Sequence, residues 1–265
     1  ILGFSPRILG MTGFAPGESL FNASLITLVN LIFTLVGLRL IDKLGRRTLL
    51  IVGSIGYIVS LSICAWAFSH YSAPFQVAEK AISFKGASAE IAKSDLTEEK
   101  RQSAEENFEA ARAALVESSN EEAYSGRRVD LPKGLTQEEN VEIANSALKE
   151  ASNKAGSGST LVLICILGFI AAHAVGQGAV IWVFISEILP AVARGFGQSL
   201  GSATHWVFAA ILTFAFPVAM EAFSATAIFG FFAFMMVLQL IWVHFMVPET
   251  KGISLEDMEE NLGKK

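Results

Sequence analysis

Long apolar runs alternate with short charged segments along this chain. Five runs are long enough to cross the hydrocarbon core of a membrane, which takes roughly 20 apolar residues. They cover about residues 19–41, 48–69, 160–186, 195–216 and 222–247. The second and fourth runs also suit buried core helices on length alone. Five such runs in one chain favour an all-α membrane protein.

Composition supports the membrane interpretation. Hydrophobic residues make up 52% of the chain and charged residues 17%, whereas about a quarter of an ordinary soluble domain is charged. Cys64 and Cys165 both fall inside apolar runs and belong to no metal-binding motif. Thiols in such places usually act as small apolar side chains. We therefore expect no metal site and no cofactor.

A polar insertion of residues 72–158 separates the second run from the third. It carries 16 acidic and 11 basic residues, a net charge of −5, which equals the formal charge of the whole chain. The remaining residues carry 9 of each sign. The insertion therefore predicts a water-exposed segment, and two capping patterns inside it predict two helices.

The first predicted helix has Asp95 as its cap and Glu98 three residues later. Its apolar stripe consists of Ala104, Phe108, Ala111 and Leu115. The second has Thr136 and Glu139 at capping-box spacing, with Val141, Ala144 and Leu148 on one face. Residues 153–159, "NKAGSGS", are typical of a flexible linker back into the membrane.

The basic residues of the short loops lie in every second connection between the runs. Because each run crosses the membrane once, these connections all lie on one side of it. They are Lys43, Arg46 and Arg47 in the first loop, Arg194 in the third, and Lys251, Lys264 and Lys265 in the tail. The positive-inside rule makes that side cytoplasmic. The insertion and the start of the chain then lie on the opposite side. The chain begins at Ile1, and we interpret it as a piece of a longer protein.

Several motifs resemble those of one transporter superfamily. "DKLGRR" between two runs resembles a loop signature of the major facilitator superfamily, and "ISEILPAVARGFG", "VPETKGISLEDME" and "GQGAVIW" resemble its sugar-porter branch. The resemblance implies the C-terminal helical bundle of that fold, with a soluble helical insertion where relatives have a short loop. Residues 1–20 would be the end of a preceding helix and an outer loop, 19–71 helices 8 and 9, 72–158 the insertion, 159–247 helices 10 to 12, and 248–265 a cytoplasmic tail.

The resemblance also implies a function. Such proteins are not enzymes; they move a monosaccharide-type sugar through the bilayer by alternating access, in some cases together with a proton. The partners would be the sugar, the lipid bilayer and the missing N-terminal half, with no nucleic acid. The protein would be a multi-pass protein of the cell (inner) membrane, with the insertion outside the cytoplasm. The alternative is a non-transporting sugar sensor on the same fold that uses the insertion.

Five residues are candidate sugar contacts. Asn30 lies in the middle of the first run, where an amide needs a partner; either a neighbouring helix or a sugar hydroxyl meets that need. Gly176 and Gly178 weaken the helix that contains Gln177. By resemblance Trp182 stacks on the sugar, although a membrane-interface tryptophan is the alternative. His205 and Trp206 occupy a matching place on the next helix, where His205 binds the substrate, bonds a helix or titrates.

Charged residues at the predicted cytoplasmic side form a candidate gate. The set consists of Asp42, Arg46, Arg47, Glu187, Arg194 and Glu249. A carboxylate and a guanidinium can join two helix ends, and by resemblance these pairs hold the outward-facing state. Ordinary topology charge explains the basic residues but not the acids.

Overall fold

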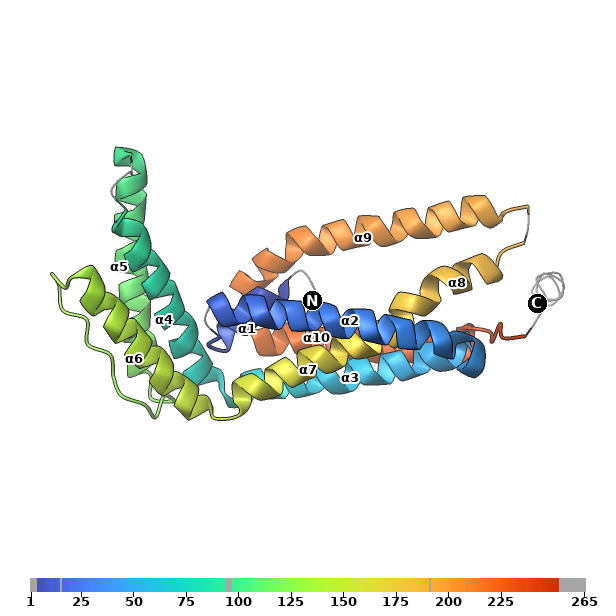
Figure 1. The fold of residues 1–265 in the computed structure, drawn as a ribbon, viewed down its shortest axis with the longest axis horizontal. Helices are drawn as coiled ribbons and strands as arrows, with labels where there is room; N and C mark the ends of the chain where they lie inside the picture. The colour runs from blue at the N-terminus through green and yellow to red at the C-terminus, as the bar shows by residue number, and fades with distance from the viewer. Residues whose placement is uncertain (1–3, 15, 94–96, 191, 253–265) are drawn as a thin grey trace. The chain divides into compact units, whose positions relative to one another are not determined.

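The computed structural model describes residues 4–14, 16–93, 97–190 and 192–252 (Figure 1). Helices and connecting turns make up these residues, and no strand occurs among them. The chain divides into two compact units. The bundle unit is Leu25–Trp66 with Cys165–Lys265, and the insertion unit is Ile1–Ser24 with Ala67–Ile164. The expected all-α architecture is confirmed.

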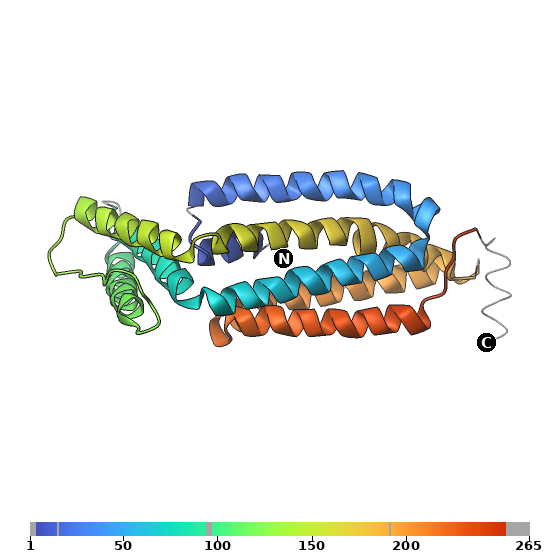
Figure 2. The ribbon, with the colours of Figure 1, turned by 90° about the horizontal axis from the view of Figure 1, so that it is seen from below.

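Five apolar helical segments agree closely with the predicted runs. They are α2 (Pro16–Leu44), α3 (Arg46–His70), α7 (Gly158–His173) continued by α8 (Ala179–Glu187), α9 (Arg194–Ala222) and α10 (Ala225–Met246). Each provides a segment long and apolar enough to cross a membrane. A helix suits hydrocarbon because it satisfies its own backbone hydrogen bonds. Figure 2 shows the bundle unit's part of α7 between those of α2 and α3.

A row of small residues brings α3 and α7 close together. A Cβ atom on Gly56 would lie 2.5 Å from the Cβ atom of Ala172, and one on Gly176 would lie 2.8 Å from the Cα atom of Gly53. Along α7 and the turn that follows it, the small residues recur every four positions, as Gly168, Ala172 and Gly176. Small residues at such spacing let membrane helices pack backbone against backbone. We call this contact the small-residue seam.

Beside the seam, larger side chains fill the end of the bundle unit where α2 meets α3. The core there consists of Ile41, Leu49, Leu50, Val180, Phe184, Val243 and Val247, all buried. It draws on α2, α3, α8, α10 and the residue after α10. Further along the unit, Cys64 and Cys165 are buried free thiols, as their apolar surroundings predict.

The described residues of the insertion form three helices rather than the two predicted from capping patterns. They are α4 (Ser72–Ile91), α5 (Glu98–Asn120) and α6 (Gln137–Ala155). Only Tyr71 lies between the end of α3 and the start of the missed helix α4, which has no side-chain cap. Its buried stripe is mostly small, with Ala73, Val77, Ala81, Phe84 and Ser88. Such a stripe is a weak hydrophobic signal, although its spacing is helical.

The core of the insertion lies where α4 packs against α5 and α6. Leu115 and Ala104 are buried, and Phe108 and Ala111 pack on this core, so the predicted stripe of α5 is confirmed. The α5 helix begins after Thr97, and the predicted cap Asp95 lies outside the described residues. On α6 the capping box of Thr136 and Glu139 is present.

The buried face of α6 differs from the predicted one. Asn140, Ala144, Ala147, Ala151 and Ala155 are the buried residues of this helix. Of the three predicted residues, Ala144 belongs to the core and Leu148 packs on it, while Val141 is only half-buried. Alanines let α6 lie close to α4, which leaves little room for a larger side chain.

The predicted flexible linker at residues 153–159 is wrong. The α6 helix continues to Ala155 and α7 begins at Gly158, so only Gly156 and Ser157 lie between them. Gly156 has φ +53°, a conformation that glycine adopts without strain and that commonly ends a helix. At Gly158 a Cβ atom would lie 2.7 Å from the Tyr71 ring, so the first residue of α7 contacts the residue between α3 and α4.

A short helix before the first span docks on the insertion. In α1 (Ser5–Met11), Ile8 and Leu9 are fully buried, and the helix packs against α4. The Ser159 hydroxyl donates to the carbonyl oxygen of Thr12 at 2.6 Å. A Cβ atom on Gly13, which has φ +93°, would lie 3.0 Å from that of Ala78. The insertion unit therefore contains residues that precede the first span as well as residues that follow the second.

We expect residues 72–158 to fold when expressed alone, because α4, α5 and α6 share a core of their own. The fragment should remain soluble and give a helical circular dichroism spectrum with a cooperative thermal transition. A random-coil spectrum would contradict the assignment of this segment as a folded domain.

The capping box makes the stability of this fragment depend on pH. The Thr136 N–H and hydroxyl donate to the Glu139 carboxylate at 2.7 and 2.9 Å, and these bonds lower the pKa of Glu139 from its ordinary value of 4.5. A carboxyl group whose pKa is lower in the folded state stabilises the fold at pH values above its ordinary pKa. This stabilisation is lost as the pH falls through the pKa of the folded state. Acid should therefore lower the Tm of the fragment less in Glu139→Gln than in Glu138→Gln, the control one residue earlier.

Candidate functional site

The turn between α2 and α3 depends on a glycine. Gly45 has φ +90°, which side chains other than glycine rarely adopt. A Cβ atom at this position would also lie 2.4 Å from Oε2 of Glu249. Gly45 therefore shapes the turn and leaves room for a carboxylate from the segment after α10. We call this region, where α2 ends and α3 begins, the charged end of the bundle unit.

Arg46 is the centre of the charged end. Its Nε and Nη2 atoms donate to the two carboxylate oxygens of Glu187 at 3.0 and 2.7 Å. Its Nη1 atom lies 3.2 Å from an Asp42 oxygen and donates to the carbonyl of Ile41 at 3.1 Å. The Arg46 side chain is 11% exposed, that of Glu187 21% and that of Asp42 79%. The two-pronged bond to Glu187 is thus the sheltered one, and such bonds fix geometry well.

The segment after α10 completes this network. Glu249 accepts a hydrogen bond from the Arg46 backbone N–H at 2.9 Å, which caps the first turn of α3. The same oxygen accepts from the backbone N–H groups of Thr250 and Lys251 at 3.0 and 3.1 Å. The Thr250 hydroxyl donates to Glu187 at 2.6 Å, and Lys251 Nζ donates to the Lys43 carbonyl at 2.6 Å. Four helix ends therefore meet.

Two predicted gate residues lie outside this network. Arg47 donates from Nη2 to the carbonyl of His244, and Arg194 donates to the carbonyl of Leu189 at 3.4 Å. Within the described part of the chain, the buried Nε atom of each has no hydrogen-bond partner. Glu187 thus pairs with Arg46 and not with Arg194. Both Arg47 and Arg194 therefore retain an unused N–H donor. A buried N–H group without a partner costs free energy.

The helix that contains Gln177 changes its winding where the two glycines weaken it. Between α7 and α8, Ala174–Gly178 forms a π-helical turn, which we call the π turn. Such turns inside α-helices are frequent at functional sites. Gln177 Nε2 donates to Ser54 Oγ at 3.0 Å and to the carbonyl of Leu50 at 3.3 Å. Its buried Oε1 has no partner among the described residues, and it lies against Gly53.

Three predicted sugar contacts lie together on α8 and α9. The rings of Trp182 and His205 meet edge to face with centroids 5.2 Å apart, and those of His205 and Trp206 meet likewise at 5.5 Å. Trp182 is 36% exposed and Trp206 67% exposed. These residues form an aromatic surface with an imidazole in its middle, a suitable face for the C–H groups of a sugar ring.

Asn30 stands apart from these residues. It is half-buried on α2, and its backbone carbonyl accepts from the Thr34 hydroxyl at 2.7 Å. Across the described residues, no hydrogen bond joins the Asn30 side chain to Gln177, Trp182, His205 or Trp206. The amide keeps its donors and its acceptor for another partner.

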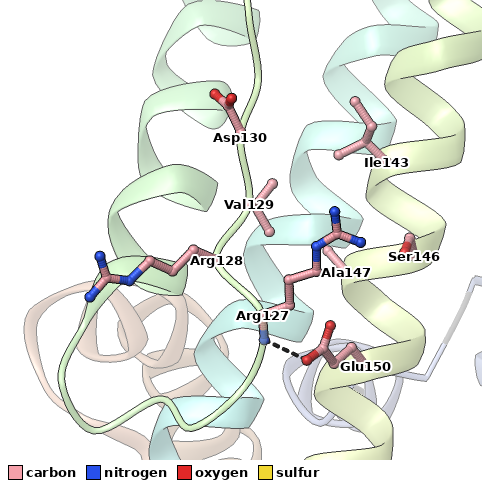
Figure 3. A pocket seen from close by; sticks show the side chains of 8 residues that line it. All are labelled: Arg127, Arg128, Val129, Asp130, Ile143, Ser146, Ala147 and Glu150. Atoms are coloured by element: carbon pink, nitrogen blue, oxygen red, sulfur yellow. Dashed lines mark hydrogen bonds between the residues drawn. The ribbon is translucent and has the colours of Figure 1, made fainter.

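A separate groove lies in the insertion unit between α6 and the extended segment before it (Figure 3). Its volume is about 270 Å³, and it is lined by Arg127, Arg128, Val129, Asp130, Ile143, Ser146, Ala147 and Glu150. The Arg127 backbone N–H donates to Glu150, while Val129 N–H donates to Ser119 Oγ at 2.9 Å. Burial and the Glu150 charge raise the pKa of the neighbouring Tyr124. The two hydrogen bonds therefore fix the segment to α6 at Arg127 and to α5 at Val129.

Prediction from sequence missed Gly45, Thr250 and Ser54. Gly45 carries a detectable signal, because a glycine between two apolar runs permits a sharp turn. Thr250 directly follows Glu249 in the quoted tail motif, yet only the folded chain shows its hydroxyl reaching Glu187. Ser54 carries no signal, because one serine in an apolar helix usually bonds its own backbone, as Ser54 also does to Leu50 at 2.8 Å.

Membrane-length helices with polar groups held between them define a multi-pass membrane protein. The family model described as "Sugar (and other) transporter" matches residues 1–88 and 143–262. The chain therefore belongs to the sugar transporter family, in agreement with the expected sugar-porter resemblance and the expectation that it is not an enzyme. The model passes over residues 89–142, which contain α5 and the groove segment.

Three relatives illustrate the breadth of this family. The chain is 28% identical over 269 residues to "Inositol transporter 4" of Arabidopsis thaliana, covering 99% of this chain and 46% of the relative. It is 25% identical over 260 residues to "D-xylose-proton symporter-like 2" of Arabidopsis thaliana, covering 98% and 35%. It is 37% identical over 105 residues to "Solute carrier family 2, facilitated glucose transporter member 6" of Homo sapiens, covering 40% and 21%. The chain thus spans less than half the length of each.

We expect Gly45→Ala to destabilise the full-length protein more than Gly252→Ala. Gly252 has φ +71° but open space around its Cβ position, so its substitution should cost only the backbone strain of about 1–2 kcal/mol. Gly45→Ala adds the collision with Glu249 and opens the hydrogen bonds around Arg46. Thermal unfolding in detergent measures both, with Gly10→Ala, which has ordinary φ and open space, as the baseline. Equal Tm values for the variants at 45 and 252 would contradict this role of Glu249.

Proposed function

We propose that the protein containing this chain moves a monosaccharide-type sugar or a related polyol across a membrane by alternating access. The observation that carries the proposal is the network at the charged end, where Arg46, Glu187, Thr250 and Glu249 join the ends of α2, α3, α8 and α10. A sheltered ion pair between helix ends can close one face of a transporter and open when the helices separate. Family membership supports the sugar as cargo.

The proposed orientation follows from charge. Lys43, Arg46 and Arg47 lie at the charged end with Arg194 and Lys251. By the positive-inside rule this end is cytoplasmic. Because α3 crosses between the charged end and α4, the insertion lies outside the cytoplasm. In this proposal, helices 8 to 12 of the transporter correspond to α2, α3, α7–α8, α9 and α10.

The proposed sugar site combines Asn30, Gln177 and the aromatic surface of Trp182, His205 and Trp206. Asn30 offers two donors and an acceptor, which suit hydroxyl groups that both donate and accept. Gln177 keeps one unpaired oxygen. Transporters of this kind hold substrate near the bilayer midplane between helical repeats, and these residues come from α2, the π turn, α8 and α9.

Uptake by the full-length protein in sealed vesicles tests the proposal. Labelled D-glucose, D-xylose and myo-inositol are suitable probes, because the names of the relatives described above include glucose, D-xylose and inositol. Saturable uptake of at least one supports transport. Binding without uptake would instead favour the non-transporting sensor.

We expect Asn30→Ala and Trp182→Ala to weaken sugar binding. Asn30→Ala leaves a sugar hydroxyl unpaired, which costs about 1–3 kcal/mol, or roughly fivefold to over a hundredfold in affinity. Trp182→Ala removes the stacking face. Trp242→Ala is the matched control, since Trp242 lies on α10 and is 54% exposed. If the first two variants lower the Tm and leave sugar affinity intact, these residues serve helix packing only.

A further inference from the structure

A histidine and a tyrosine are hydrogen-bonded in the middle of the bundle unit. Tyr57 lies near the centre of α3 and is 5% exposed, and its hydroxyl bonds Nδ1 of His173. Its ring packs on Phe169 with centroids 4.5 Å apart. His173 lies midway along the span Gly158–Glu187. An ionisable side chain at this depth is costly and usually functional.

The imidazole is seated directly beside the π turn. His173 is the last residue of α7, and the π turn begins at the next residue. A Cβ atom on Gly178 would lie 3.3 Å from His173 Nε2, so a glycine there leaves room for the ring. Gln177 belongs to the same turn and bonds Ser54, one helical turn before Tyr57 on α3. Any change at His173 therefore acts on the backbone that holds a proposed sugar contact.

Few other ionisable groups share the interior of these spans. Asp42 and Glu187 are the only acidic residues in the five spans, and both lie at the charged end. On α2, Arg39 lies six residues before Gly45; on α10, His244 lies in the last turn. Tyr57 on α3 is hydrogen-bonded to His173, and His205 lies on α9. Within the described residues, these five spans contain no carboxylate away from the charged end.

We infer that His173 is a proton-binding site that couples sugar passage to proton concentration; this inference rests on the proposed transport function. In the neutral form Nδ1 accepts the Tyr57 O–H. When one proton binds at Nδ1, that nitrogen becomes a donor, so the Tyr57 hydroxyl must turn and accept. The charge then favours a water-filled surrounding over hydrocarbon. Both effects act at the start of the π turn, and the proton leaves when the imidazole returns to its bond with Tyr57.

A purely structural role predicts something different. Polar side chains often bond across membrane helices and contribute stability alone. Replacement of His173 by glutamine, which keeps hydrogen-bonding capacity but does not titrate, would then lower the Tm without changing how activity depends on pH. The pH profile therefore separates the two roles.

The first experiment measures initial uptake by the full-length protein in vesicles, with the sugar that the wild type takes up. We expect the wild-type rate to change by about threefold or more between about pH 5.5 and 7.5, where imidazole changes its charge. His173→Gln should abolish that change, and Tyr57→Phe should shift it along the pH axis. His205→Gln should alter affinity but retain the pH dependence. An unchanged profile in His173→Gln, or a wild-type rate independent of pH, would overturn the inference.

A second experiment does not require transport. The full-length protein with isotope-labelled histidine is titrated in detergent micelles by NMR, and the signal lost in His173→Gln identifies this imidazole. We expect this signal to move between about pH 5 and 8 and to titrate at a different pH in Tyr57→Phe. A signal that stays fixed across this range would overturn the inference even if uptake succeeds. Vesicles without sugar uptake but with a titrating signal would overturn the proposed function and retain the proton site.

Discussion

The contact between α3 and α7 is the constraint on which the rest of the bundle unit depends. Gly53, Gly56 and Gly176 allow two backbones to touch, and no larger side chain fits at these positions. Lipid gives helices little hydrophobic reason to associate, so close packing and hydrogen bonds must hold them. The small-residue seam supplies both, because it brings the Gln177 amide to Ser54 and the His173 ring to Tyr57.

The middle of the α7–α8 segment and its charged end use different kinds of polar contact. In the interior, Gln177 and His173 have neutral partners on α3, so these hydrogen bonds form without burying charge. At the charged end, Arg46 and Glu187 meet where water is near, so the cost of removing them from water is smaller than in the interior. Along one helix, the polar partners therefore change from neutral to ionic as the membrane boundary approaches.

Prediction from the sequence succeeded where the signal was local. Apolar length marked the five spans to within a few residues, and capping residues marked the start of α6. The glycines around Gln177 indicated a weakened helix, which is the π turn. Each of these features depends on neighbours in the chain, so one sequence contains the information.

Prediction failed where the signal was small or distant. Helix α4 buries alanine and serine, which contribute little to a hydrophobic pattern. The partner of Glu187 lies 141 residues away, and charge type alone could not select Arg46 over Arg194. Similarly, a stretch rich in glycine and serine suggested a flexible linker, whereas helices continue into it from both sides.

The contact between Tyr71 and Gly158 has a consequence for how such a chain can change over time. The polypeptide leaves α3 and returns to α7 at nearly the same point, with the whole insertion enclosed between two touching residues. A segment attached in this way can change in length between α4 and α6 while the ends of the spans stay in place. Its sequence is therefore free to diverge at a different pace from that of the bundle.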